Sequence, residues 1–202
     1  VSVAACYASG KTFLAACLLL WWLYTRTPAM VVTTAPTKRQ VEKLLWRYVR
    51  KLHKRARRRL PGRLLTTELK LDEDQMAFGF TGNSGHAVQG IHESENVLFI
   101  EDEAAGMKAE ILEDFEGITT GMGSRHLKIG NPTSDSGPFY DSHEHPRESL
   151  NWKQFNISAY ETPNIIAGET VVRGLVEMDW VIRIEQKYGK DSPFFVTKVE
   201  GR

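Results

Sequence analysis

The feature that most constrains this chain is a turn of small residues that joins an apolar strand to an apolar helix close to residue 10. Residues 1–5 are typical of a buried strand, and residues 11–24 are apolar almost all round, which indicates a buried helix. Backbone N–H groups in a turn before a helix bind phosphates, and a Gly-Lys-Thr ending adds a lysine and a hydroxyl. The pattern predicts a phosphate-binding loop made of Ala5, Cys6, Tyr7, Ala8, Ser9, Gly10, Lys11 and Thr12.

In this interpretation Lys11 contacts the β- and γ-phosphates of a nucleotide, and the Thr12 hydroxyl ligates Mg²⁺. Ala5 stands where the G-x-x-x-x-G-K-[ST] pattern has its first glycine. The alternative is a helix that happens to begin with Gly-Lys-Thr and binds nothing.

A second pattern follows about ninety residues later, where apolar residues 97–100 lead into Glu101-Asp102-Glu103. A strand that ends in acids delivers them to the carboxyl edge of a parallel sheet, where phosphate loops also lie. We expect Asp102 to hold Mg²⁺ and Glu103 to polarise the attacking water. If the strand ends one residue earlier, Glu101 and Asp102 take these roles. The alternative without chemistry is an acidic turn that caps a helix.

A third strand pattern, at residues 126–129, ends in Gly130-Asn131-Pro132. Its position would place Asn131 next to the γ-phosphate, although an Asn-Pro turn that only ends a strand is the competing interpretation. Together with a helix expected at residues 108–115, the order of elements predicts an α/β fold with a mainly parallel sheet flanked by helices. Further strands are expected at residues 30–34, 66–71 and 76–81, and a loop at residues 134–147.

Charge is distributed unevenly along the chain. Residues 38–63 contain twelve Lys and Arg and the single acid Glu42, so this segment carries +11 although the whole chain carries only +1. Such a segment is either the solvated face of a helix that starts after Thr37 or a surface for the phosphates of DNA. The candidate DNA-binding residues are Arg47, Arg50, Lys51, Lys54 and Arg58.

Composition excludes several classes of protein. With 42% hydrophobic and 25% charged residues the chain is unlike disordered or low-complexity sequences. Two cysteines are too few for a disulfide framework. The longest apolar run, residues 13–24, is shorter than the roughly 20 residues of a membrane-spanning helix. Because the sequence begins without methionine, we expect it to be a fragment of a longer chain.

Together these motifs resemble the large terminase subunit of tailed bacteriophages and prophages, the ATPase that drives DNA into capsids. The likeness covers nearly the whole chain. Its strongest parts are the phosphate loop and residues 97–104, and weaker stretches follow in the family's order. These weaker stretches are residues 31–40, Gln89-Gly90-Ile91-His92, and residues 130–133, 137–139, 156–159, 162–164 and 188–195.

The resemblance implies a RecA-like P-loop ATPase of the additional-strand catalytic glutamate type, with ATP and Mg²⁺ as cofactors. Lys11, Thr12, Asp102 and Glu103 would carry ATP hydrolysis, and Asn131 would couple it to DNA movement. An ATPase core would span residues 1–147 and a small linking subdomain residues 148–202. The nuclease domain of the family has no counterpart here, so DNA cleavage is not expected.

The implied partners are double-stranded DNA, the portal and the small terminase subunit, with the chain in a homo-oligomeric ring in the cytoplasm of the bacterial host and no membrane. Positions 6–9 lack the arginine that some relatives have in this loop. We therefore expect the activating arginine to come from elsewhere, with Arg125 of an adjacent subunit as the candidate. Two alternatives stay open: the first motor domain of a superfamily 2 helicase, and a catalytically inactive module that docks on DNA or on the capsid.

Overall fold

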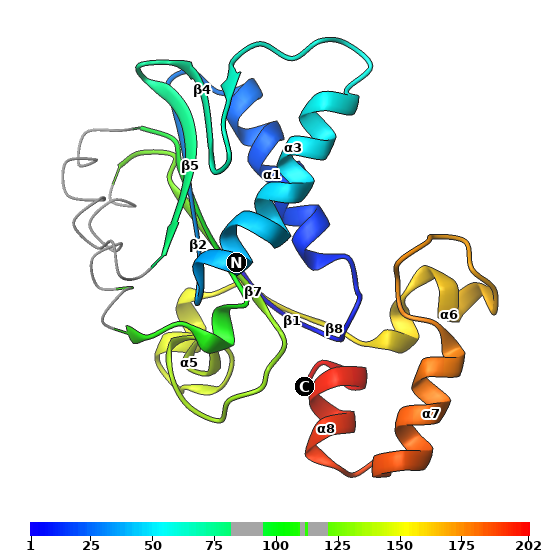
Figure 1. Cartoon of the computed structure of the whole chain (residues 1–202). Helices are drawn as coiled ribbons and strands as arrows, with labels where there is room; N and C mark the ends of the chain where they lie inside the picture. Colours follow the sequence, from blue (N-terminus) through cyan, green and yellow to red (C-terminus); the bar gives the residue numbers. More distant parts are fainter. Residues whose placement is uncertain (82–94, 110–111, 113–120) are drawn as a thin grey trace. The chain divides into compact units, whose positions relative to one another are not determined.

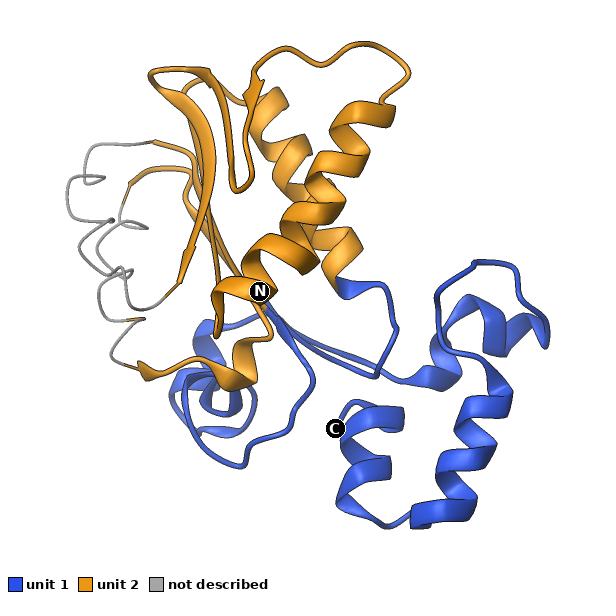
Figure 2. Ribbon diagram, in the orientation of Figure 1, with its two compact units in different colours: residues 1–11, 129–202 blue, residues 12–128 orange. Residues whose placement is uncertain are grey.

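The computed structural model describes residues 1–81, 95–109, 112 and 121–202. The chain forms two compact units, which Figure 2 colours separately. Unit 1 comprises residues 1–11 and 129–202, and unit 2 comprises residues 12–128. Unit 1 therefore combines the first residues of the chain with its C-terminal part.

Unit 2 is built on strands in the order β3-β4-β5-β2-β6-β7. Strand β2 runs parallel to both β5 and β6, whereas β4 pairs antiparallel with both β3 and β5 at the edge. Strand β7 begins in unit 2 and ends in unit 1. The bounds are β2 Ala29–Ala35, β3 Arg63–Leu64, β4 Glu68–Asp72, β5 Gln75–Thr81, β6 Val97–Asp102 and β7 Arg125–Gly130.

Two helices lie side by side along one face of these strands, α1 and α3 (Figure 1). The rings of Phe13 and Tyr48 join them edge to face, with centroids 5.7 Å apart. Thr37 caps the second helical run, because its hydroxyl accepts the N–H of Gln40 at 3.3 Å. The bounds are α1 Lys11–Thr25, α2 Lys38–Gln40, the π-helical turn η1 Val41–Leu45, α3 Trp46–Arg55 and the 3₁₀ turn η3 Ala104–Gly106.

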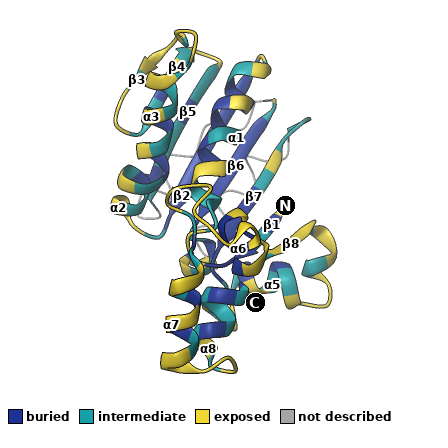
Figure 3. Cartoon of the chain, turned by 90° about the vertical axis from the view of Figure 1, so that its right-hand side faces the viewer, coloured by how far each residue is buried: buried dark blue, intermediate teal, exposed yellow. Residues whose placement is uncertain are grey.

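The core of unit 2 explains why its central strands carry long apolar runs. All residues of β2 and β6 are buried, as strands covered on both faces require (Figure 3). Alternate residues Met30 and Val32 of β2 pack with Val97 and Phe99 of β6 and with Phe80. On the helical side, the Trp46 indole donates a hydrogen bond to Thr33 Oγ1 at 2.9 Å and ties α3 to β2.

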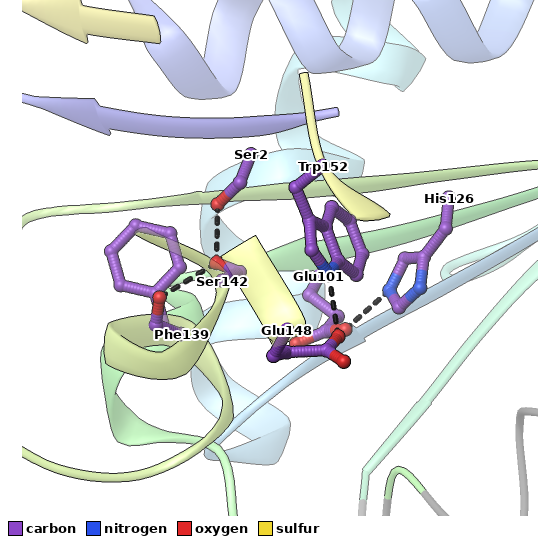
Figure 4. Close-up of polar contacts among 7 residues, drawn as sticks. All are labelled: Ser2, Glu101, His126, Phe139, Ser142, Glu148 and Trp152. Carbon is purple, nitrogen blue, oxygen red and sulfur yellow. Dashed lines mark hydrogen bonds and ion pairs between the residues drawn. The ribbon is translucent and has the colours of Figure 1, made fainter. Parts of the chain in front are cut away.

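Unit 1 is built on β1 (Ser2–Ala5), which pairs parallel with β8 (Gln154–Ile157) and lies between β7 and β8 in the strand order. The hydroxyls of Ser2 and Ser142 lie 2.8 Å apart and join β1 to helix α5 (Pro138–Glu144) (Figure 4). After α5, the Trp152 indole donates to Glu148 at 2.7 Å.

The rest of unit 1 is helical and surrounds a second core. This core contains Cys6 of the predicted phosphate loop together with Ala159, Val181, Phe195 and Val199. The bounds are η5 Glu148–Asn151, η6 Ala159–Glu161, α6 Pro163–Ala167, α7 Met178–Tyr188, α8 Pro193–Phe195 and the π-helical turn η7 Val196–Glu200. The loop after β1 is therefore part of the packing of the C-terminal helices.

The α/β fold with a mainly parallel sheet flanked by helices is confirmed. The prediction of a loop at residues 134–147 is wrong, because Pro138–Glu144 form helix α5. Pro138 occupies the first helical position, where proline favours helix initiation. Most of the helix expected at residues 108–115, and the motif at residues 89–92, lie outside the described residues. The division at residue 147 stays a prediction. Within the described ranges, none of the helices has both the length and the apolar character needed to cross a membrane.

Candidate nucleotide-binding site

The predicted phosphate loop lies between the end of β1 at Ala5 and the start of α1 at Lys11. Two of its residues have left-handed backbone conformations, Ala8 with φ 50° and Gly10 with φ 86°. No acceptor in the described part of the chain takes the N–H groups of Ala8, Ser9 or Gly10. The first N–H groups of a helix have no partner inside it. The loop therefore presents a row of donors, which is the arrangement that binds phosphate.

The first half of the loop is used differently. The Cys6 N–H donates to the Ile157 carbonyl at 2.8 Å, and the Tyr7 N–H donates to the Lys198 carbonyl at 2.9 Å. Ala8 accepts the N–H of Val176 at 3.1 Å through its own carbonyl. Of the eight residues expected to bind phosphate, Cys6 and Tyr7 therefore fix the loop with their amides, and the free donors begin at Ala8. Sequence alone could not separate these halves, because the fixing carbonyls come from residues 157 and 198.

Lys11 and Asn131 meet within unit 1. Lys11 Nζ donates to Asn131 Oδ1 at 3.3 Å, and Asn131 Nδ2 donates to the Ala5 carbonyl at 2.6 Å. Asn131 is only 3% exposed. Both ends of its side-chain amide are held by hydrogen bonds to loop residues. The Ser9 hydroxyl in the same loop is buried and has no partner in the described residues. A buried hydroxyl without a partner is costly, and a bound phosphate oxygen would satisfy it.

The Cys6 side chain has no part in such chemistry. Burial raises the pKa of its thiol to about 11, although the nearby Lys11 ammonium opposes the shift. A thiol with this pKa is neutral at pH 7 and a poor nucleophile. Cys6 acts instead as a small apolar residue of the second core.

Thr12 and Asp102 meet within unit 2. The Thr12 hydroxyl donates to Asp102 Oδ1 at 3.1 Å, and Asp102 is 1% exposed at the end of β6. A hydroxyl and a carboxylate are oxygen ligands of the kind that Mg²⁺ takes. These two residues therefore fit a magnesium ion by their chemistry and their contact.

Glu103 follows directly and has a backbone in the left-handed region, with φ 57° and ψ 44°. Its N–H donates to Asp102 Oδ1 at 3.2 Å. Ala8, Asn96 and Glu103 are the non-glycine residues with positive φ in the described chain, and two of them belong to the predicted site. Strained backbones of this kind concentrate at functional sites because the surrounding structure must hold them.

Glu101, the alternative metal ligand, has another partner. It is fully buried, and its carboxylate makes a hydrogen-bonding contact with His126 Nε2 on β7 (Figure 4). The His126 ring also lies 4.6 Å from the Phe99 ring. Because successive strand residues point to opposite faces, Glu101 and Asp102 of β6 face opposite sides of the sheet. This geometry supports the register with Asp102 and Glu103.

The remaining candidate residues lie outside this arrangement. Arg125 is exposed at the amino end of β7, where its guanidinium donates to the neighbouring Ser124 carbonyl at 2.6 Å. Asn131 follows the opposite end of the same strand. Arg125 therefore lies at the opposite end of β7 from Asn131, and its role as an activating arginine stays a prediction.

The cations of the basic segment at residues 38–63 differ in their contacts. Arg47, Lys51 and Lys54 are exposed on α3. The Arg50 guanidinium instead donates to the carbonyls of Thr66 and Glu42, the latter at 3.0 Å, so Arg50 holds the helix to the next hairpin. Arg58 does not lie on the helix as expected, because α3 ends at Arg55. A groove of about 810 Å³ beside α3 is lined by Arg50, His53, Lys54, residues 64–67 and Glu68.

Known proteins that resemble this chain in sequence or in structure include large terminases. A probable terminase large subunit of Enterobacteria phage P7 is 26% identical over 214 residues, which cover 99% of this chain and 41% of that protein. The ATPase domain of the Thermus phage P74-26 large terminase superposes with a TM-score of 0.70 at 15% identity, over the whole chain and 87% of the domain. The chain has the fold of large terminase ATPase domains.

Other large terminases agree. The large terminase of a thermophilic bacteriophage gives a TM-score of 0.71 at 14% identity, and that of bacteriophage HK97 gives 0.68 at 13%. Both superpose over all of this chain, which covers 48% and 47% of the respective structures. No family model matches the sequence. The resemblance to large terminases is confirmed, and the chain spans less than half the length of the curated relative that it matches.

Proposed function

We propose that this chain is the ATP-hydrolysing motor domain of a phage DNA-packaging terminase, which couples ATP hydrolysis to the movement of double-stranded DNA into a capsid. The observation that carries the proposal is the pair of hydrogen bonds at consecutive residues, Lys11 to Asn131 and Thr12 to Asp102. The large terminase of the thermophilic bacteriophage, whose fold this chain shares, has structures with ADP and with ATP-gamma-S. These structures support a nucleotide site in this chain.

In this proposal the N–H groups of residues 8–12 bind the phosphates of ATP, and Lys11 exchanges its contact with Asn131 for the β- and γ-phosphates. Thr12 and Asp102 would hold Mg²⁺, which would neutralise phosphate charge. Asn131 loses a partner when Lys11 turns to the phosphates. Because the other end of its amide stays on the Ala5 carbonyl, it can report the state of the γ-phosphate to the end of β7.

Glu103 is the proposed base that orients and polarises the attacking water. Unlike Asp102 it is not fully buried, so its carboxylate can reach a water molecule. The Asp102 carboxylate fixes the Glu103 backbone through the N–H contact, which links the metal ligand to the base.

The first experiment measures equilibrium binding of Mg²⁺–ATPγS to the wild-type chain and to Lys11→Ala by isothermal titration, with phosphate release in the presence and absence of duplex DNA. We expect Lys11→Ala to lose binding, because Lys11 is the only side-chain cation in the loop. Wild-type affinity in Lys11→Ala would contradict the site. If the chain binds DNA without releasing phosphate, the catalytically inactive docking module is favoured. If it separates the strands of duplex DNA, the superfamily 2 helicase is favoured.

The exposed cations of α3 are the proposed contact for duplex DNA. Reversal of Arg47, Lys51 and Lys54 to Glu should weaken binding to random duplexes and reduce its dependence on salt, because each lost phosphate contact lowers the salt slope by about one. Reversal of three exposed cations of unit 1, Arg173, Arg183 and Lys187, changes the net charge equally and is the control. Equal affinity for both triple variants would show that α3 is only a solvated face.

The activating arginine is proposed to come from Arg125 of an adjacent subunit in a ring that also contacts the portal and the small subunit in the host cytoplasm. An arginine supplied in this way raises phosphoryl transfer rates by roughly 10³–10⁵. Specific activity should therefore rise with protein concentration. Mixed Lys11→Ala and Arg125→Ala chains should recover activity that each lacks alone, and failure of this rescue would contradict the arrangement.

A further inference from the structure

The phosphate loop has a single cation of its own. Lys11 is the only Lys or Arg among residues 5–12. A nucleoside triphosphate with one divalent ion retains negative charge beyond what one lysine neutralises, and phosphoryl transfer depends on such charges being met. A second cation close to the loop would therefore complete the site from within the same chain.

Lys198 lies against the loop through both its backbone and its side chain. Its carbonyl accepts the Tyr7 N–H at 2.9 Å, and its Nζ lies 4.3 Å from the centroid of the Tyr7 ring. The Trp180 ring lies on the same tyrosine, with centroids 6.2 Å apart. The backbone contact keeps Lys198 beside the loop, while its four-carbon side chain remains able to turn.

Among the residues that the structure describes, no carboxylate pairs with the Lys198 ammonium. Across the described residues, the lysines and arginines that pair with carboxylates are Lys38 with Glu42, Lys190 with Glu185 and Arg202 with Glu200, and Lys198 belongs to none of these pairs. The acid nearest in sequence, Glu200, is occupied by Arg202. A cation–π contact is weaker than a charge-assisted hydrogen bond to phosphate, so the ammonium can leave the ring for a bound anion.

We propose that Lys198 is a second phosphate-binding cation, supplied by the C-terminal helical part of unit 1, which leaves the Tyr7 ring to contact the phosphates of a nucleotide in the loop. The inference rests on the proposed function, because it requires a nucleotide at this loop. The inference goes beyond the proposed function, because the sequence pattern did not indicate Lys198. It also gives the C-terminal helices a direct means to detect whether the loop is filled.

The test uses the full chain and the equilibrium dissociation constant of Mg²⁺–ATPγS, with the thermal midpoint of the nucleotide-free protein measured in parallel. Lys198→Met keeps the apolar side chain on the Tyr7 ring and removes the charge, whereas Lys198→Arg keeps the charge. Lys187→Met is the matched control, because Lys187 Nζ lies 4.9 Å from the Tyr188 ring in the same unit, in a cation–π contact that involves no loop residue.

We expect Lys198→Met to weaken ATPγS binding about tenfold, as the loss of a charged hydrogen bond does, while Lys198→Arg and Lys187→Met stay within about twofold of wild type. The thermal midpoints of the three variants should equal that of the wild type. Unchanged affinity in Lys198→Met, or an equal loss in Lys198→Met and Lys198→Arg with lower midpoints, would overturn the inference. A wild-type chain that binds no ATPγS would refute the proposed function itself, whereas wild-type binding with an unaffected Lys198→Met refutes only the role of Lys198.

Discussion

A methyl group added at Gly201 should disturb the phosphate loop, whereas the same change at Gly168 should not. The two glycines end η7 and α6 with nearly the same backbone, φ 70° and 69° respectively. A Cβ at Gly168 would meet nothing within 4 Å. A Cβ at Gly201 would lie 2.7 Å from the Ile157 carbonyl oxygen and 2.9 Å from the Cys6 nitrogen. The pair therefore separates the cost of the left-handed backbone from the cost of contact with the loop.

The backbone cost is common to both positions and amounts to about 1 kcal/mol. At Gly201 the obstructing atoms are backbone atoms that cannot rotate away, and overpacking of this kind costs about 1–3 kcal/mol. The Cys6 N–H to Ile157 bond lies at the same contact, and its loss adds about 1 kcal/mol. We expect Gly168→Ala to lose about 1 kcal/mol and Gly201→Ala about 3–5 kcal/mol.

Urea unfolding followed by tryptophan fluorescence measures both losses in parallel. Because about 1 kcal/mol corresponds to 2–4 °C in a chain of this length, thermal midpoints should separate the variants clearly. Gly201→Ala should also weaken ATPγS binding, since the displaced backbone begins the phosphate loop, and Gly168→Ala should not. Equal stability losses in the two variants would refute the packing of residue 201 on the loop.

Three further changes test the structure around the site. Thr33→Val should cost about 1–3 kcal/mol because it leaves the buried Trp46 indole N–H without its acceptor, which calorimetry can measure. Arg50→Ala should lower the thermal midpoint, since it removes two carbonyl contacts, while Lys51→Ala should leave it unchanged. Alkylation of Cys6 by iodoacetamide should be negligible at pH 7 and rise towards pH 11, because its raised pKa keeps the thiol protonated; rapid labelling at pH 7 would contradict the burial.

The strand, turn and helix around the predicted phosphate loop could be predicted from sequence because their signals are local. A strand, a turn of small residues and a helix that starts at Lys11 occupy consecutive positions, and each has its own periodicity. The Thr37 cap and the apolar strand before Asp102 are equally local signals. In each case the neighbours in sequence are the neighbours that matter.

The parts that sequence missed depend on distant partners. Helix α5 lies in a stretch rich in Gly, Pro and Ser, and its only local signal was Pro138 at the first helical position. The sequence pattern that indicated Arg50 as a DNA-binding residue does not report its carbonyl acceptors, one of which belongs to Thr66 in the next hairpin. The contacts of Tyr7 with Lys198 join residues at opposite ends of the chain, and no periodicity reports them.

The most direct test of the account is single-turnover ATP hydrolysis by Glu103→Gln, with ATPγS affinity measured on the same protein. Glu101→Gln is the matched control, because Glu101 is the adjacent carboxylate and its partner is His126 rather than Thr12. The account predicts that Glu103→Gln binds ATPγS as the wild type does but hydrolyses ATP about 10²–10⁴-fold more slowly. Glu101→Gln should lose stability and keep the greater part of its hydrolysis. Hydrolysis at the wild-type rate in Glu103→Gln, with the loss found in Glu101→Gln instead, would contradict the assignment of the catalytic base.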